Sequence, residues 1–170
     1  LIDLRSLKSL VMIGLGLSLI KPPSKMIIMT FLYLKSKGYR VDGIGWQGHL
    51  MNNQGLKQFV ENLDEELKKL SDLIDWAHSN KLEFHITELD YYNNGENNIF
   101  NSVEKQAEVY QKLMKLSQEK SKNGLVTVNF WSMGERKSSR GLKGHYMSLY
   151  DNDTIPTKTY QVVKNFINFN

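Results

Sequence analysis

The clearest pattern of apolar and polar positions in this chain lies in residues 56–77. Apolar residues recur there three and four positions apart, which is typical of one face of a helix. The residues that mark this face are Leu56, Phe59, Val60, Leu63, Leu67, Leu70, Leu73, Ile74 and Ala77. On the other face, Asp64 with Lys68 and Glu65 with Lys69 are predicted to form ion pairs four residues apart. We therefore expect one long amphipathic helix here.

The other helices and strands are predicted from capping residues and from short apolar runs. Ser24 is a suitable N-cap and Gly38 a suitable stop for a helix between them. Asn101, with Glu104 three residues later, opens a helix that runs to about residue 117. A closing helix is expected at residues 160–167, and three short apolar runs predict buried strands at 39–46, 82–89 and 124–131.

The apolar residues 9–20 leave two interpretations open. Arg5 and Lys8 precede them, as in a secretory signal, but no small-residue cleavage site follows. The alternative, which we favour, is a buried strand in a truncated chain, because Lys21 and two prolines come next and the sequence starts without methionine. We treat residues 1–21 as an atypical apolar segment that precedes the region 22–170.

The order of these elements predicts an α/β fold. Four strand–helix units in sequence imply parallel strands joined by crossover helices. An eightfold barrel of this kind takes about 250 residues, so four units in 170 residues correspond to part of one. A small open doubly wound sheet has the same order of elements. Periodicity does not separate the two architectures.

Two carboxylates stand at the end of the strand predicted at residues 82–89. Because side chains alternate along a strand, Glu88 and Asp90 are expected on one face, above Phe84 and Ile86, with His85 on the other face. The rule also groups Gln47 with His49 on the preceding strand and Trp131 with Asn129 and Thr127 on the following one. In a parallel barrel all these strand ends meet at one rim, where active sites are built.

A carboxylate at such a rim can be a nucleophile, a base, a metal ligand or the cap of the next loop. His49, Glu88 and Asp90 could make a site with two carboxylates and one histidine, but no second histidine has a strand-end position. His78 falls in a helix and His145 in a polar segment, where surface or packing roles are the expectation. We predict no metal and no other cofactor.

Composition narrows the class of protein. The chain has 41% hydrophobic and 24% charged residues, as in an ordinary globular domain, and it has no cysteine. Its net charge of +4 is spread along the chain and not gathered into a basic stripe, so we expect no nucleic-acid partner. No apolar run approaches the roughly 20 residues that a membrane span needs.

Four motifs, in this order and at these separations, carry a resemblance to a known family. "VDGIGWQGHL", "ITELD", "VNFW" and "SLYDNDTIPTKTYQVV" are similar to the C-terminal half of the glycoside hydrolase family 10 endo-β-1,4-xylanases. The resemblance runs from about Pro22 to the end of the chain. It implies that residues 22–170 are the C-terminal part of a (β/α)8 barrel, about four strand–helix units of an incomplete barrel.

The resemblance also implies roles for individual residues. Glu88 matches the nucleophile of a retaining glycosidase, and His49 and Asp90 match the residues that support it. Gln47 and Trp131 match residues that line the sugar site. The expected substrate is xylan or a related β-1,4-linked polysaccharide. The family is mostly secreted, which implies an extracellular location.

The resemblance is incomplete. The family's acid/base glutamate lies in a "WDVVNEA"-like motif, which these 170 residues lack. The first four strand–helix units have no counterpart either, so we expect a fragment whose open sheet edges favour self-association. The alternative, from another class, is a non-catalytic remnant that binds carbohydrate.

Overall fold

The structure is a computed structural model that describes residues 10–13, 23–50, 54–92, 100, 102–131, 133, 149–151 and 155–167. The strands in these ranges are β1 (Leu10–Ile13), β2 (Gly43–Trp46), β3 (His49–Leu50), β4 (Glu83–Tyr91) and β5 (Val126–Phe130). The helices are α1 (Pro23–Ser36), α2 (Gln54–Glu61), α3 (Leu63–Ser79), α4 (Val103–Lys120) and α5 (Lys158–Ile167).

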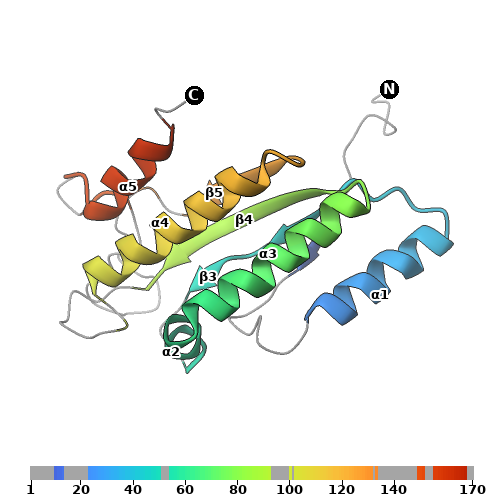
Figure 1. The fold of residues 1–170 in the computed structure, drawn as a ribbon, viewed down its shortest axis with the longest axis horizontal. Coiled ribbons are helices and arrows are strands. Elements are labelled where there is room, and N and C mark those ends of the chain that lie inside the picture. Colours follow the sequence, from blue (N-terminus) through green and yellow to red (C-terminus); the bar gives the residue numbers. More distant parts are fainter. Residues whose placement is uncertain are drawn as a thin grey trace.

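The strands form one parallel sheet around β4, the long central strand in Figure 1. β1 pairs with β2, β2 pairs with β4, and β5 also pairs with β4. The two-residue strand β3 pairs with β4 farther along, so that His49 is level with Asp90. The predicted parallel sheet is thus confirmed, and within the described residues it is open. The strand expected at 9–20 is present at Leu10–Ile13, and residues 14–20 lie outside the described ranges.

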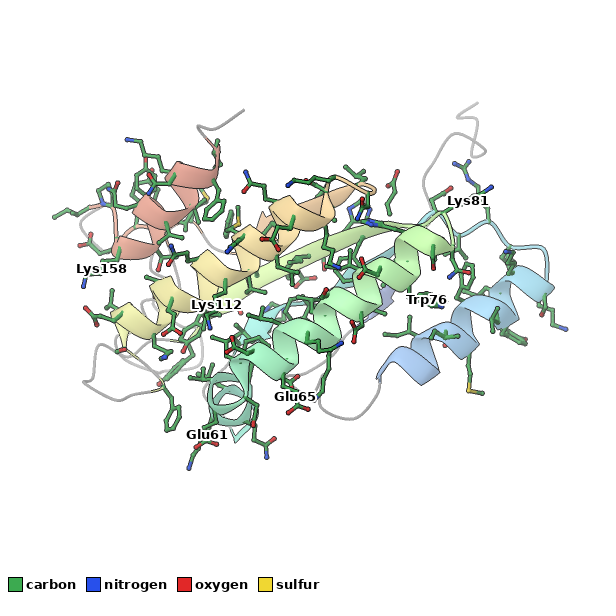
Figure 2. All side chains as sticks on the ribbon, viewed as in Figure 1. Glu61, Glu65, Trp76, Lys81, Lys112 and Lys158 are labelled. Atoms are coloured by element: carbon green, nitrogen blue, oxygen red, sulfur yellow. The ribbon has the colours of Figure 1, made fainter. Side chains whose placement is uncertain are left out.

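Helices α3 and α4 lie across one face of this sheet, with α1 and α5 on either side of them (Figure 1). Phe31 of α1 meets Trp76 of α3 edge to face, with ring centroids 5.5 Å apart. Figure 2 labels Trp76 on α3. Tyr110 of α4 stacks on Phe130 of β5 at 5.9 Å. The buried layer between helices and sheet includes Ile44, Trp46, Leu70, Ile74, Phe84, Ile86, Val109 and Leu113. None of the helices in the described ranges is long and apolar enough to cross a bilayer.

Strand β4 has one residue more than each neighbour needs between Ile86 and Leu89. On one side, the step from Trp46 to His49 is opposite the longer step from Ile86 to Asp90. On the other side, Val128 to Phe130 is opposite Ile86 to Leu89. A single residue in excess on one strand is a β-bulge, and it reverses the alternation of side chains beyond it.

The bulge corrects the predicted faces of β4. Phe84 and Ile86 are fully buried under the helices, and Leu89, only 1% exposed, joins them. Glu88 lies with His85 on the opposite face, which we call the inner face: His85 is level with Gly45, and Glu88 bonds Gln47 two residues farther on. The prediction that Phe84 and Ile86 lie below Glu88, with His85 across the sheet, was wrong because it assumed unbroken alternation.

The helix predicted over residues 56–77 is two helices, α2 and α3, separated at Asn62. The side-chain amide of Asn62 donates to the carbonyl of Gln58 at 2.9 Å, and its backbone departs from helical values at φ −115° and ψ 31°. Asparagine competes for backbone hydrogen bonds in this way, which makes it a common helix terminator. The apolar face continues through the break, which is why the pattern alone did not reveal it.

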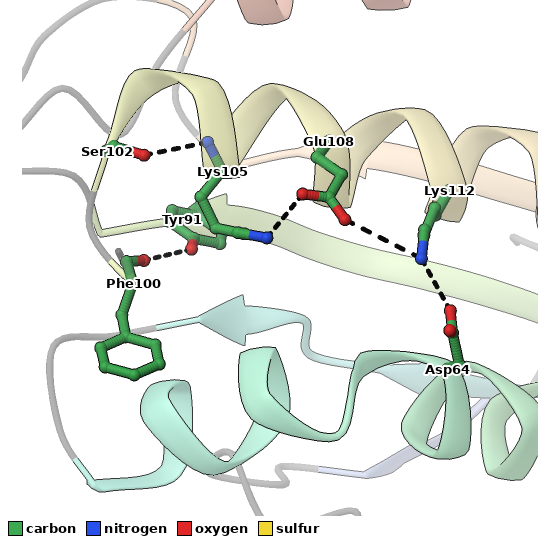
Figure 3. Close-up of polar contacts among 7 residues, drawn as sticks. All are labelled: Asp64, Tyr91, Phe100, Ser102, Lys105, Glu108 and Lys112. Carbon is green, nitrogen blue, oxygen red and sulfur yellow. Dashed lines mark hydrogen bonds and ion pairs between the residues drawn. The ribbon is translucent and has the colours of Figure 1, made fainter. Parts of the chain in front are cut away.

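The first turn of α4 ties the helix layer to the end of β4 (Figure 3). Ser102, and not the predicted Asn101, is the N-cap, and its hydroxyl accepts from the Lys105 amide at 3.1 Å. The Tyr91 hydroxyl, at the end of β4, donates to the Phe100 carbonyl just before the helix. Both ends of the connection between β4 and α4 are therefore fixed to each other.

The predicted ion pairs on α3 are half correct. Lys69 pairs with Glu65 at 2.8 Å, as expected. Asp64 pairs instead with Lys112 of α4 at 2.7 Å, as Figure 3 shows, and Lys68 turns to Asp72. A neighbouring helix supplied a cation that the pattern of a single helix could not include.

The face assignment at the bulge predicts that shortening Leu89 lowers the free energy of unfolding more than shortening Thr87 does. Leu89→Ala should destabilise the protein by about 2–5 kcal/mol, because it empties a fully buried position. Thr87→Ala, which removes the hydroxyl that donates to the Trp46 carbonyl and the neighbouring methyl group, should cost about 1–2 kcal/mol. Urea unfolding of both variants measures the two losses. A Leu89→Ala loss no greater than that of Thr87→Ala would contradict the assignment of faces.

Candidate active site

The inner face brings four of the predicted site residues together at the ends of β2, β3 and β4. The Gln47 side-chain amide donates to Glu88 Oε1 at 2.8 Å. Nε2 of His49 lies 2.9 Å from Glu88 Oε2, and Nδ1 of the same ring lies 3.0 Å from Asp90 Oδ1. Glu88 is thus held at both oxygens, and His49 lies between two carboxylates.

Two local features of the backbone produce this convergence. The bulge puts Glu88 on the inner face, and the pairing of β3 puts His49 level with Asp90. Gly48, between the two Glu88 partners, faces the core: a Cβ atom there would lie 3.2 Å from Leu89 Cδ1. Its carbonyl accepts from the Asp90 amide at 3.3 Å, which keeps β3 against β4.

The two contacts of His49 restrict where protons can be. An ionised carboxylate only accepts hydrogen bonds, so each imidazole nitrogen needs a proton toward its partner. With Glu88 ionised, either His49 is a cation between two carboxylates, or it is neutral and Asp90 carries a proton toward Nδ1. In both arrangements Nε2–H donates to Glu88. The carboxylate of Glu88 therefore keeps its donor whichever group holds the second proton.

Asp90 is the buried member of this cluster. Only 2% of the residue is exposed, and its Oδ1 meets His49 at a short distance but without the alignment of a full hydrogen bond. Burial raises the pKa of the Asp90 carboxyl, the nearby His49 ring opposes that rise, and the charge of Glu88 adds to it. Asp90 is therefore a group that can share its proton with His49.

Trp131 stands beside the carboxylate cluster and is open to solvent. Its indole meets the His49 ring edge to face, with centroids 5.6 Å apart, and half of the residue is exposed. Its backbone amide donates to the Leu89 carbonyl at 3.0 Å, so the residue is anchored to β4 next to Glu88. All five predicted site residues therefore lie at one place on the inner face.

A second polar cluster lies deeper on the inner face, and the sequence analysis did not predict it. His85 Nδ1 is 2.8 Å from the Thr127 hydroxyl, and His85 Nε2 is 3.2 Å from Glu83. The parallel register that puts His85 level with Thr127 would have revealed this contact, but register comes from pairing and not from one strand. His78 packs against Gly124, as its helical position suggested.

The geometry of the site does not favour a metal ion. Within the described ranges, no group of three or more His, Asp or Glu side chains is arranged to hold one. The reason is visible at His49, which presents a different nitrogen to each carboxylate, so that the three groups have no common centre.

The fold and the site define an α/β protein with a parallel sheet, open within the described residues, that carries a carboxylate pair and an imidazole at its strand ends. The comparison with known proteins identifies the family: residues 19–166 match a sequence model of glycosyl hydrolase family 10. The chain belongs to glycosyl hydrolase family 10. This also decides between the two architectures that periodicity left open, in favour of the barrel.

Individual relatives agree with this assignment. Endo-1,4-beta-xylanase A of Thermoanaerobacterium saccharolyticum is 34% identical over 103 residues, which cover 60% of this chain and 8% of that protein. An endo-1,4-beta-xylanase/feruloyl esterase of Xylanibacter ruminicola is 26% identical over 146 residues, covering 78% of this chain and 18% of that protein. The chain spans less than a fifth of the length of these two relatives.

Solved structures show the same fold. An intracellular xylanase from Thermoanaerobacterium saccharolyticum superposes with a TM-score of 0.64 at 22% identity, over 94% of this chain and 44% of that one. Xylanase 10B from Thermotoga maritima superposes with a TM-score of 0.58 at 24% identity, over 85% and 42%. The chain thus corresponds to somewhat less than half of each barrel.

The raised pKa of Asp90 predicts how stability depends on pH. A carboxyl whose pKa is higher in the folded state contributes stability that is complete below its ordinary pKa and is lost as pH rises through the raised value. Asp90→Asn removes this loss. The variant should therefore gain stability relative to the parent as pH rises from about 4 to 7, by about 1.4 kcal/mol for each unit by which the pKa is raised.

Urea unfolding of both proteins at several pH values in that range measures the difference. Titratable groups that do not interact with Asp90 contribute equally in both proteins and cancel in the comparison. If the stability of Asp90→Asn relative to the parent stays constant or falls as pH rises, the raised pKa of Asp90 is contradicted.

Proposed function

We propose that this chain supplies the nucleophile side of the active site of a retaining endo-β-1,4-xylanase, with Glu88 as the nucleophile. The observation that carries the proposal is the pair of hydrogen bonds that hold both Glu88 oxygens, from Gln47 and His49. A nucleophilic carboxylate has to stay ionised and keep one orientation. Two donors stabilise the ionised form and fix the side-chain rotamer.

His49 and Asp90 act on Glu88 as positioning residues. Asp90 lies beside Nδ1 of the imidazole, which leaves Nε2 as the donor that faces Glu88. Because Asp90 is buried and its pKa is raised, it can take up a proton when His49 becomes neutral. The hydrogen bond to Glu88 is then maintained through the reaction.

The first chemical step forms a bond between a Glu88 oxygen and the anomeric carbon and breaks the bond from that carbon to the leaving sugar oxygen. The departing oxygen needs a proton from a second carboxyl about 5–5.5 Å from the nucleophile. We propose that this acid/base residue belongs to a part of the barrel outside these 170 residues. Water then hydrolyses the glycosyl ester on Glu88 and regenerates the carboxylate.

Xylan or a related β-1,4-linked polysaccharide is the proposed substrate. Two structural neighbours were solved with such ligands: a Thermotoga petrophila xylanase with xylobiose, and a variant of the Thermoanaerobacterium saccharolyticum xylanase with xylotetraose. Trp131 supports the same assignment, because its half-exposed ring beside His49 offers a flat apolar surface to a sugar ring.

Covalent labelling tests the nucleophile. The purified chain is incubated with a 2-fluoro xylobioside that carries a dinitrophenyl leaving group, and its intact mass is measured. This leaving group departs with little acid assistance, so a missing acid/base residue does not block the first step. We expect an adduct of one disaccharide, mapped to Glu88 by peptide analysis, and no adduct on Glu88→Gln.

Glu83→Gln is the matched control, since Glu83 is a carboxylate of the same strand that contacts His85 and not Gln47 or His49. It should label like the parent. An adduct on Glu88→Gln would mean that the nucleophile is misassigned. No adduct on a parent sample that circular dichroism shows to be folded would favour a carbohydrate-binding role without catalysis.

A further inference from the structure

A groove runs between α4 and α5 on the outside of the molecule, away from Glu88. Figure 1 shows the two helices side by side, and the Lys158–Glu104 ion pair joins their first turns. The groove has a volume of about 510 Å³ and is lined by Gln111, Gln118, Val162, Asn165 and Phe166. This volume lies within the range of about 300–1,000 Å³ that small-molecule sites occupy.

The described residues of the lining combine planar amides with apolar side chains, and none of them is charged. Val162 and Phe166 are four residues apart on α5, so they share one face of that helix. Gln111 and Gln118 are exposed and lie two turns apart on α4, a distance of about 10.5 Å along the helix axis. The amides therefore border a groove that is longer than a single small ion or solvent molecule requires.

The three side-chain amides are available to a ligand. Among the described residues, Gln111, Gln118 and Asn165 form no side-chain hydrogen bond with the rest of the chain. Each amide offers donors and an acceptor at once, which suits neighbouring hydroxyl groups. Because the described lining residues are uncharged, they give no advantage to phosphates, nucleic acids or anionic lipids, which are bound through basic side chains.

We propose that this groove is a second, non-catalytic site that binds a neutral β-1,4-linked oligosaccharide. The half-buried Phe166 offers its ring to one sugar, and Gln111, Gln118 and Asn165 bond the hydroxyl groups along its edges. The identity of the sugar rests on the proposed function, because the same polysaccharide would be held here and cleaved at Glu88.

The groove lies apart from the site at which the polysaccharide would be cleaved. Val109 and Leu113 of α4 are buried against the sheet, whereas Gln111 and Gln118 are exposed. Helix α4 and the sheet therefore lie between the groove and the inner face that carries Glu88. A chain bound in the groove keeps polysaccharide at the surface of the protein without touching the reacting atoms.

Nuclear magnetic resonance of the labelled 170-residue chain tests this site and the active site in one titration. Xylohexaose is added, and the side-chain amide signals of Gln111, Gln118 and Asn165 report on the groove. The Trp131 indole N–H reports on the active site. We expect saturable shifts of the groove signals, and we expect Phe166→Ala to weaken that affinity about three- to tenfold through loss of the aromatic contact.

Ile167→Ala is the matched control, because Ile167 is the exposed neighbour of Phe166 and does not line the groove. It should leave the affinity unchanged. If Phe166→Ala fails to fold, Gln118→Ala against Gln161→Ala makes the same comparison at exposed positions, with weakening expected only from Gln118→Ala.

The outcomes distinguish the two proposals. Groove signals that do not move, that move equally with sorbitol at matched hydroxyl concentration, or that respond alike to the two variants would overturn the second site. If only the Trp131 signal moves, the second site fails and the proposed active site remains. If only the groove signals move, the second site stands and sugar binding beside Glu88 fails.

Discussion

The extra residue in β4, between Ile86 and Leu89, is the constraint on which the site depends. In a strand with unbroken alternation, residue 88 would follow Phe84 and Ile86 into the core. It could not then also face the inner side of the sheet. With the bulge, Leu89 continues the buried series while Glu88 turns toward Gln47 and His49. The unpaired residue costs ladder bonds locally, and β3 and β5 resume the pairing beyond it.

On the inner face, the hydrogen-bond partners of Glu88 are Gln47 and His49, and these two residues determine its environment. Gln47 is neutral, and His49 is shared with Asp90, so the cluster has two carboxylates but only one group that can become cationic among its members. Burial raises the pKa of the Asp90 carboxyl above its ordinary value. A proton held between His49 and Asp90 satisfies the buried aspartate and leaves Glu88 as the carboxylate that accepts. This asymmetry is what the proposed role of Glu88 as a nucleophile requires.

The helix layer supports the site from behind and presents a different surface to solvent. Tyr91 and Ser102 fix the connection from β4 into α4, and Asp64 with Lys112 joins α3 to α4 (Figure 3). The buried face of α4 is mostly apolar, with Val109, Tyr110 and Leu113, and its outer face borders the amide-lined groove. One rigid helix thus serves a core, a site on one side of the sheet and a second surface on the other.

The sequence by itself determined the order of strands and helices, the parallel sheet and the residues that gather at the strand ends, since these follow from local periodicity and from motifs. The bulge and the partner of Asp64 were decided only by the tertiary structure, because each depends on a neighbour distant in the chain. The break at Asn62 is local, through its contact with Gln58, but the unbroken apolar face concealed it. The extra residue of β4 is defined only by pairing with β2, β3 and β5. Asp64 pairs with Lys112 because α4 packs beside α3. The contact between His85 and Thr127 likewise depends on the register of two paired strands, which the sequence of one strand does not contain.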